Sequence, residues 1–323
     1  MGREPLVAGE SDVELVVLVL GHESLPYSVN ETLQRSTWAD EASCDPRVRI
    51  YWVYADPTAR SVREEPTREL FIPVAGREPE GIGNSIVLEK TVGAVLWALE
   101  RFHPRYVLRT NTSSYLHIPE MLRELSALET HGVYRGVIGT DQNKSVGKID
   151  FVSGASMLMT PDVAMRLATL DASEYPELLE DVALGAFLEA QGVEPQGATR
   201  VDVSDGEPLR FGSFVRLKSY VSDQTTQRRM VEVDEIFSET DADARLEKLK
   251  EHDRRETARI YRQRINSELL LTARPFVYRA TRALISTLNL RGYLDERRSR
   301  NSSLAARSGT FEVVPSREQN DAI

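Results

Sequence analysis

Two apolar segments of strand length constrain the fold of this chain more than any other feature of its sequence. Residues 13–20 read VELVVLVL and residues 48–54 read VRIYWVY. Apolar runs with little polar alternation are typical of strands that are covered on both faces, as in parallel sheets with helical crossovers. Gly21 follows the first run, and Asp56 and Pro57 follow the second. The sequence therefore predicts two strands buried inside a sheet.

Further strands and helices alternate along the chain as far as residue 191. Strands are predicted over residues 70–74, 106–110, 133–140 and 151–159, and helices over residues 84–102, 119–128 and 179–191. Thr160, Pro161 and Asp162 supply the capping hydroxyl, first-turn proline and early acid of another helix start. This alternation predicts an α/β domain with a mostly parallel central sheet flanked by helices.

The character of the sequence changes after about residue 234. Residues 241–264 carry many charges of both signs and predict an exposed helix. Residues 265–294 are more apolar and also predict a helix, with a break at Pro275. We therefore expect four parts: a disordered N-terminus over 1–11, an α/β domain over 12–235, a helical appendage over 236–299 and a disordered tail over 300–323.

Charge and composition argue against several classes of protein. The formal net charge of −10 disfavours nucleic-acid binding over the whole surface. Cys44 is the single cysteine, so a disulfide within the chain is impossible and a cysteine-based zinc site is not expected. The first twelve residues are polar and lack the pattern of a signal peptide. We expect a cytoplasmic protein, with peripheral membrane contact left open.

The commonest short motifs of catalysis and phosphate binding are missing. The chain has no GxxxxGK[ST], and Gly81 and Gly83 lack the third glycine of GxGxxG. It also has no HExxH and no GxSxG. These absences remove the main support for a P-loop enzyme, a zinc metalloprotease or a serine hydrolase.

Four other segments, taken in order, resemble one family of enzymes. They read RSTW over 35–38, YVLRTNTSSYLHI over 106–118, FVSGASMLMT over 151–160 and EDVALG over 180–185. This set is similar to the β-1,3-galactosyltransferase and Fringe-like glycosyltransferases, which have the GT-A fold. The resemblance implies a GT-A-like domain and a hexosyltransferase that inverts the anomeric carbon. It also implies a UDP-linked sugar donor and a saccharide or glycolipid acceptor, as in polysaccharide biosynthesis.

The chain departs from that family at the position of its metal-binding acids. The resemblance places those acids at Asn111, Thr112 and Ser113, where this chain has no carboxylate. Mg²⁺ and Mn²⁺ prefer anionic oxygen ligands, which amide and hydroxyl groups do not supply. We expect no metal cofactor. Two alternatives stay open: another acid supplies the ligands, or activity has been lost.

A transfer mechanism without a metal still needs a cation and a base. Negative charge develops on the departing diphosphate, and Lys90, Arg109, Lys144 and Lys148 are the candidates to stabilise it, with Arg109 favoured. The acceptor hydroxyl needs a general base, and the resemblance assigns that role to Asp181 or, less readily, to Glu180. Asp181 has an alternative structural role as an acid at a helix start.

The predicted donor site contains eight residues, which come from strand ends and from the family motifs: Arg35, Asp56, Lys90, Arg109, Asn111, Ser113, Ser153 and Gly154. Each has a structural alternative, such as packing for Arg35, a turn for Asn111 and Asp56, and close backbone approach for Gly154. Trp38 is expected in the core. His22 and His117 are lone histidines with a smaller expectation of a site role.

Two rival functions remain from the sequence. The first is a catalytically silent nucleotide- or glycan-binding protein on the same fold. The second is a membrane- or partner-docking protein, or a homo-oligomer, that acts through the arginine-rich C-terminal helices. Their apolar face would consist of Leu269, Leu270, Leu271, Phe276, Val277, Leu284, Ile285 and Leu288.

Overall fold

The computed structural model describes residues 13–42, 45–76, 85–143, 147–203, 209–218 and 222–259. The chain divides into two units, Met1–Thr257 and Ala258–Ile323, and the second lies almost wholly outside the described residues. Several predictions also lie outside them. These are the N-terminus over 1–11, Cys44, Gly81, Gly83, Lys144, the helix over 265–294 with Pro275 and its apolar face, and the tail over 300–323.

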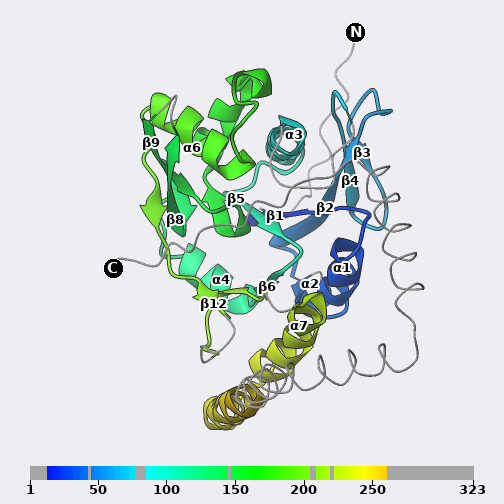
Figure 1. The fold of residues 1–323 in the computed structure, drawn as a ribbon, viewed down its shortest axis with the longest axis vertical. Helices are drawn as coiled ribbons and strands as arrows, with labels where there is room; N and C mark the ends of the chain where they lie inside the picture. Colours follow the sequence, from blue (N-terminus) through cyan, green and yellow to red (C-terminus); the bar gives the residue numbers. More distant parts are fainter. Residues whose placement is uncertain are drawn as a thin grey trace, which may run out of the picture. The chain divides into compact units, whose positions relative to one another are not determined.

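A sheet forms the centre of the first unit (Figure 1), and it has eight strands. In spatial order its strands are β11 (Gln196–Gly197), β7 (Tyr134–Gly136), β10 (Met157–Met159), β5 (Tyr106–Asn111), β1 (Leu15–Leu20), β2 (Val48–Asp56), β4 (Glu69–Pro73) and β3 (Arg63–Glu64). The four strands β5, β1, β2 and β4 run parallel. Strand β10 is antiparallel to both its neighbours, and β3 is antiparallel to β4. The predicted α/β class is confirmed, and the antiparallel pairs lie outside its parallel centre.

Strand β1 lies in the middle of the parallel group, and its sequence explains that place. All six of its residues are buried. Val16, Leu18 and Leu20 pack on one face of the sheet, and Leu15, Val17 and Val19 pack on the other. Side chains of a strand point to opposite faces in turn, so a strand covered on both sides must be apolar at every position.

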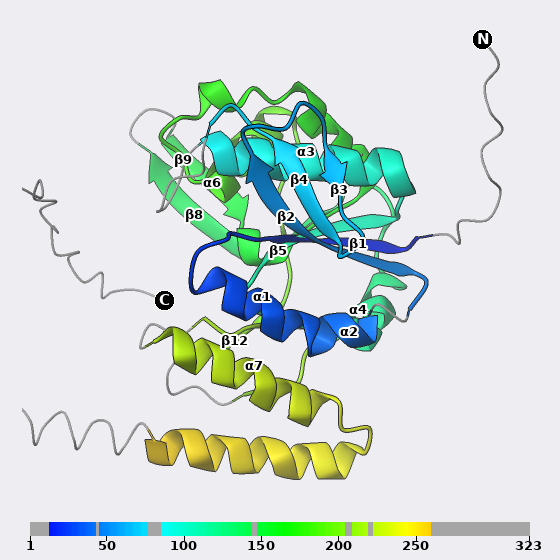
Figure 2. The same cartoon turned by 90° about the vertical axis from the view of Figure 1, so that its right-hand side faces the viewer.

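Helices cover both faces of the sheet, as Figures 1 and 2 show together. Helices α3 (Ser85–Phe102), α5 (Pro161–Ala164) and α6 (Glu180–Ala190) pack on one face. On the other face lie α1 (Tyr27–Arg35), α2 (Trp38–Ala42), α4 (Ile118–Leu125) and α7 (Asp223–Phe237). Trp38 is 1% exposed in that second cluster, which confirms its place in the core.

Two segments predicted as single strands are each divided in the structure. Residues 133–140 form β7 and the start of β8 (Ile138–Asn143), which pairs with β9 (Gly147–Val152) in a separate hairpin. Residues 151–159 form the end of β9, a 3-10 turn η1 (Gly154–Ser156) and β10. The turn connects the hairpin to the central sheet, so residues 151–159 contribute to two different sheets.

The remaining short elements complete the unit. Strands β12 (Val201–Asp202), β13 (Phe214–Arg216) and β6 (Ser114–Leu116) form a three-stranded sheet. Two 3-10 helices, η2 (Met165–Thr169) and η3 (Ala172–Glu174), follow α5. The helix predicted after Thr160 begins where expected, with Pro161 in its first turn. The predicted cap is wrong, because the Thr160 hydroxyl accepts a hydrogen bond from the Val133 N–H at 3.0 Å instead.

Helix α7 belongs to the packed unit. Ser222 caps its start by accepting a hydrogen bond from the Thr225 N–H, and its residues Met230, Val233 and Phe237 are buried. A further helix over residues 242–259 packs beside it in Figure 2, within the range predicted for an exposed helix. The predicted boundary after residue 235 thus falls inside α7, whereas the division between the two units falls at residue 257. None of the helices in the described part has the length and apolar content to cross a membrane.

Candidate functional site

The carboxyl ends of the parallel strands bring several predicted site residues to one edge of the sheet. Leu20 at the end of β1 pairs with Asn111 at the end of β5 and with Val53 in β2. Strand β2 continues to Asp56. Ligands of open α/β sheets usually bind at this edge.

Arg109 and Glu180 form a buried ion pair behind this edge. Arg109 Nε donates to Glu180 Oε1 at 3.0 Å, and Nη2 donates to Oε2 at 2.7 Å. Thr91 on α3 donates a further hydrogen bond to Oε1 at 2.8 Å. Both charged side chains are less than a tenth exposed. Burial raises the pKa of the Glu180 carboxyl, and the Arg109 guanidinium acts in the opposite direction.

Gly154 allows the Arg109 guanidinium to approach the backbone closely. Arg109 Nη1 donates a close hydrogen bond to the Gly154 carbonyl. A methyl group on Gly154 would lie 2.6 Å from Arg109 Nη1 and 2.8 Å from its Cζ. The backbone approach that the sequence predicted at Gly154 is therefore an approach to Arg109.

Asp181 lies beside the same glycine at the start of α6. Its Oδ2 accepts a hydrogen bond from the Gly154 N–H at 3.0 Å, and its Oδ1 accepts one from the Val182 N–H at 3.1 Å. The side chain is only partly buried, unlike that of Glu180. Ser153, which directly precedes Gly154, accepts a hydrogen bond from Arg200 at 3.2 Å. Asp181, Ser153, Gly154 and Arg109 thus lie together.

The structure brings Lys90 to the end of β1 but leaves Lys148 on the hairpin of β8 and β9. Lys90 is 1% exposed, and its Nζ donates to the carbonyl of Gly21 at 3.1 Å, just after β1. Its neighbour Thr91 contacts Glu180, so α3 links the end of β1 to the buried ion pair. Lys148 pairs with Asp150 at 2.7 Å on the exposed hairpin strand β9.

Strand β5 ends in a turn built from neutral side chains. Asn111 Oδ1 accepts hydrogen bonds from the Ser113 N–H at 3.2 Å, the Ser113 hydroxyl at 2.9 Å and the Ser114 hydroxyl at 3.0 Å. Thr112 between them is buried. The position that the family resemblance assigns to metal-binding acids is therefore a hydrogen-bonded turn.

A cavity of about 540 Å³ opens beyond the ends of β1 and β2. Tyr54 and Phe71 stack in its wall with their ring centroids 5.5 Å apart. Thr58 holds Asp56 Oδ1 through its N–H at 2.8 Å and its hydroxyl at 2.7 Å, and these bonds keep the pKa of Asp56 below its usual value. The cavity is lined by His22, Glu23, Tyr54, Ala55, Asp56, Pro57, Thr58, Arg63 and Phe71.

The cavity contains residues that sequence analysis did not select. The guanidinium carbon of Arg63 lies 4.0 Å from the centroid of the Phe71 ring. Its Nη2 lies 3.8 Å from Asp56 Oδ2. Tyr54 precedes Asp56 by two positions in β2, so its place at the strand end was a usable signal. No sequence pattern pointed to Arg63, because its contacts come from a separate strand. His22 lines the cavity, whereas His117 accepts a hydrogen bond at the start of α4.

Arg35 is the predicted donor residue that the structure does not bring to this edge. Its Nη2 pairs with Glu31 and with Glu69 at 2.8 Å each. Its guanidinium carbon lies 3.6 Å from the centroid of the Trp52 ring. Glu69 is the first residue of β4, so these contacts lie toward the amino end of that strand. A role for Arg35 in donor binding stays a prediction.

Comparisons with known proteins give limited similarity. No protein-family model matches the chain. A search of curated proteins finds no match either. Among solved structures, the chain is similar to a glycosyltransferase involved in the glycosylation of the major capsid of PBCV-1, with a TM-score of 0.43 and 10% sequence identity. The match covers 68% of this chain and 98% of the other. A TM-score of this size assigns neither a fold family nor an activity.

Proposed function

We propose that this protein is a glycosyltransferase that moves a sugar from a UDP-linked donor to a hydroxyl group of a saccharide or glycolipid. The observation that carries the proposal is the position of Asp181, a partly exposed carboxylate held by two backbone N–H groups at the start of α6. It contacts Gly154, whose carbonyl accepts a hydrogen bond from the buried Arg109 of β5, whereas the cavity is lined by residues that follow β1, by the end of β2 and the residues after it, and by residues of β3 and β4. A base and a nucleotide-sized cavity are the parts that an inverting transfer requires.

The cavity supports the donor half of this proposal. Its volume of about 540 Å³ lies within the range of small-molecule sites, roughly 300–1,000 Å³. The stacked rings of Tyr54 and Phe71 offer an apolar wall for a nucleotide base. The low pKa of Asp56 favours the carboxylate form, which accepts hydrogen bonds from ribose hydroxyl groups.

The diphosphate needs a cation that can reach it. Arg109 is engaged by Glu180 and Gly154, so we assign it to holding the site together rather than to charge stabilisation. Arg63 also pairs with Glu65, but it lines the cavity and its side chain is 49% exposed, unlike that of Arg109. We propose that Arg63 contacts the diphosphate and that the reaction needs no divalent metal, since Asn111 and Ser113 supply no carboxylate.

In the proposed reaction the acceptor hydroxyl attacks the anomeric carbon of the donor sugar. The new glycosidic bond forms as the bond to the diphosphate breaks, and Asp181 takes the hydroxyl proton. Direct displacement inverts the anomeric carbon with a single base. A retaining reaction would need a different arrangement of groups.

Nucleotide binding is the first test. A thermal-shift series with UDP, GDP and ADP, each with EDTA and with Mn²⁺, should raise the melting temperature most with UDP, and Mn²⁺ should add little. Asp56→Asn should weaken the UDP shift, whereas Glu189→Gln, an exposed acid at the far end of α6, should not. A UDP shift that appears only with Mn²⁺ would contradict metal-independent donor binding.

The main rival is a protein that binds nucleotide sugars without transferring them. The neutralised Arg109–Glu180 pair is the observation that favours it, because neither charge is available to a substrate. Release of UDP from UDP-sugars separates the two functions. Release that falls at least tenfold in Asp181→Asn supports transfer, and UDP binding without release across a panel of saccharide acceptors supports the rival. The docking function belongs to residues outside those described and would be tested by membrane co-sedimentation after deletion of residues 260–323.

A further inference from the structure

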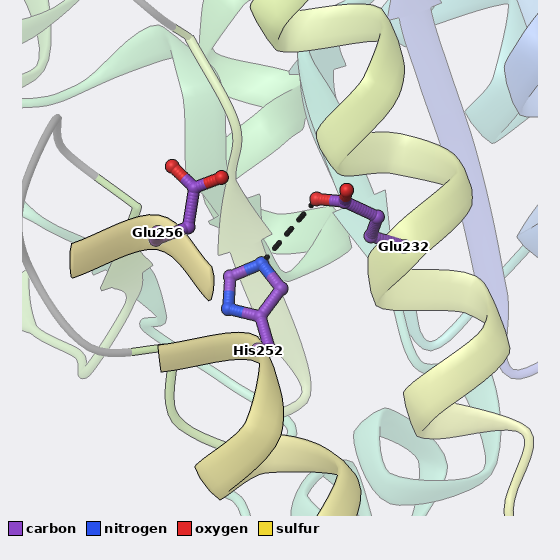
Figure 3. Close-up of side chains that lie close together, drawn as sticks. All are labelled: Glu232, His252 and Glu256. Carbon is purple, nitrogen blue, oxygen red and sulfur yellow. Dashed lines mark ion pairs between the residues drawn. The ribbon is translucent and has the colours of Figure 1, made fainter. Parts of the chain in front are cut away.

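A cluster of possible metal ligands joins α7 to the helix over residues 242–259. Figure 3 shows Glu232 of α7 facing His252 and Glu256 of the second helix. His252 and Glu256 are four residues apart, which places them on the same face of that helix. One ligand atom from each of the three residues lies within 4.8 Å of the other two. The cluster is distant in sequence from every residue of the proposed transfer site.

His252 has an unusual environment within this cluster. Its side chain is 6% exposed, and neither ring nitrogen has a hydrogen-bond partner among the described residues. Its nearest acidic neighbours are Glu232, 3.5 Å from Nε2, and Asp253, 3.8 Å from Nδ1. Burying a polar group without a hydrogen bond costs free energy, so a buried imidazole with two open nitrogens calls for another partner.

We propose that His252, Glu232 and Glu256 bind a divalent transition-metal ion of the zinc class. Imidazole nitrogen together with two carboxylates suits Zn²⁺, whereas Mg²⁺ and Ca²⁺ prefer sites made of oxygen alone. Three protein ligands leave a fourth position of a tetrahedral ion for water. This inference is independent of the proposed transferase activity.

The spacing of the ligand atoms fits a small ion. Bonds of about 2.0 Å to a tetrahedral zinc ion place neighbouring ligand atoms about 3.3 Å apart. His252 Nε2 and Glu232 Oε2 are already 3.5 Å apart. The widest separation, at most 4.8 Å, must shorten by roughly 1.5 Å, which the long glutamate side chains can supply through their torsions.

Two arginines hold the carboxylates in place. Arg228 Nη2 donates to Glu256 Oε1 at 2.8 Å, and its Nε lies 3.3 Å from Glu232 Oε1. Arg229 Nη2 lies 3.9 Å from Glu256 Oε2. Hydrogen bonds of this kind commonly orient metal-binding carboxylates.

The site has a structural consequence because its ligands come from two helices. A bound ion would fasten the helix over residues 242–259 to α7, which itself packs on the central sheet through Met230 and Val233. Metal binding to the folded protein should therefore stabilise this end of the unit.

The test uses the full-length protein after EDTA treatment and dialysis, with ZnCl₂ as the titrant. We expect one saturable zinc equivalent by calorimetry and a higher melting temperature at saturation. His252→Gln and Glu232→Gln should each weaken zinc affinity at least tenfold. Matched controls are His131→Gln, an exposed histidine, Glu235→Gln, an exposed acid on α7, and Cys44→Ser, which removes the single thiol. The controls should keep the affinity of the wild type.

Two results would overturn the proposal: the absence of a saturable zinc site in the wild type, or equal affinity in the wild type and His252→Gln. Circular dichroism reports whether each variant folds. If His252→Gln does not fold, Glu232→Gln decides, since its side chain is 30% exposed and its replacement keeps the shape. Co²⁺ gives a second readout, because the visible absorption of a tetrahedral cobalt site should appear in the wild type and be lost in Glu232→Gln.

Discussion

The buried network formed by Arg109, Glu180 and Gly154 differs from the cavity beyond β2 in the exposure of its charged side chains. In the network, Arg109 and Glu180 satisfy each other and are closed to solvent. In the cavity wall, Arg63 and Asp56 are partly exposed and their charged atoms are 3.8 Å apart. Asp181 lies beside the network yet keeps partial exposure. A charged residue in a family-like motif can thus stabilise the fold while its neighbour in the sequence remains accessible to a substrate.

The largest expected effect separates Asp181 from the network beside it. Asp181→Asn should lower transfer by about 100- to 10,000-fold, the usual contribution of a positioned base. Folding should change little, because the asparagine oxygen can still accept the hydrogen bond from Gly154. UDP release and thermal unfolding measure the two properties, with Glu189→Gln as control. Full activity in Asp181→Asn would remove the proposed base.

Breaking the ion pair of Arg109 and Glu180 should lower the unfolding free energy of the protein as well as its activity. Glu180→Gln leaves Arg109 buried without a counter-charge and should cost about 3–5 kcal/mol of unfolding free energy. Replacing both partners, as Arg109→Met with Glu180→Leu, should cost less than the single change. Urea unfolding measures the three proteins. A Glu180→Gln variant of wild-type stability would show that the pair contributes nothing to the scaffold.

Crowding the network should have a smaller effect. Gly154→Ala places a methyl group 2.6 Å from Arg109 Nη1, so the guanidinium must shift from its present position. We expect a loss of about 1–3 kcal/mol in unfolding free energy. Gly197→Ala is the control, since its new methyl group would meet its nearest atom at 3.9 Å. Equal stability of the two variants would argue against a tight fit around Arg109.

Arg35 tests whether a motif residue far from the cavity acts on the donor. Its ion pairs and its contact with Trp52 are partly exposed, so Arg35→Ala should cost about 1 kcal/mol of unfolding free energy. We expect the UDP thermal shift to persist in this variant, in contrast to Asp56→Asn. Loss of UDP binding in a folded Arg35→Ala protein would restore its predicted role in the donor site.

The smallest effect concerns the pH dependence of stability. Hydrogen bonds from Thr58 hold the pKa of Asp56 below its usual value of about 3.9, so its carboxylate stabilises the folded state above that pH. This contribution is lost as pH falls through the lower, folded-state pKa. Asp56→Asn removes it, so the stability gap between the wild type and the variant should narrow on acidification. Urea unfolding between about pH 6 and pH 3 measures the gap.

Local patterns predicted the elements that have one consistent apolar face. Strand β1 and helix α6 follow from apolar runs and from an acid-rich helix start, and both are found close to the expected bounds. Helix α1 was missed because it buries polar side chains. Gln34 is fully buried, and its amide donates to the carbonyls of Asn111 and Ser114 in a part of the chain far along the sequence. No local periodicity can reveal such partners.

The sheet edge could be predicted from local patterns alone, since strands that end near Gly21, Asp56 and Asn111 meet there once they pair in parallel. Local patterns also predicted a helix start at Glu180 and Asp181. Which of these two acids is buried against Arg109 depends on the folded structure, because that pair joins residues 71 positions apart. The same holds for His252, whose open nitrogens exist only where two helices pack together. Periodicity is local, whereas the pairing and burial of charge depend on residues that folding brings together.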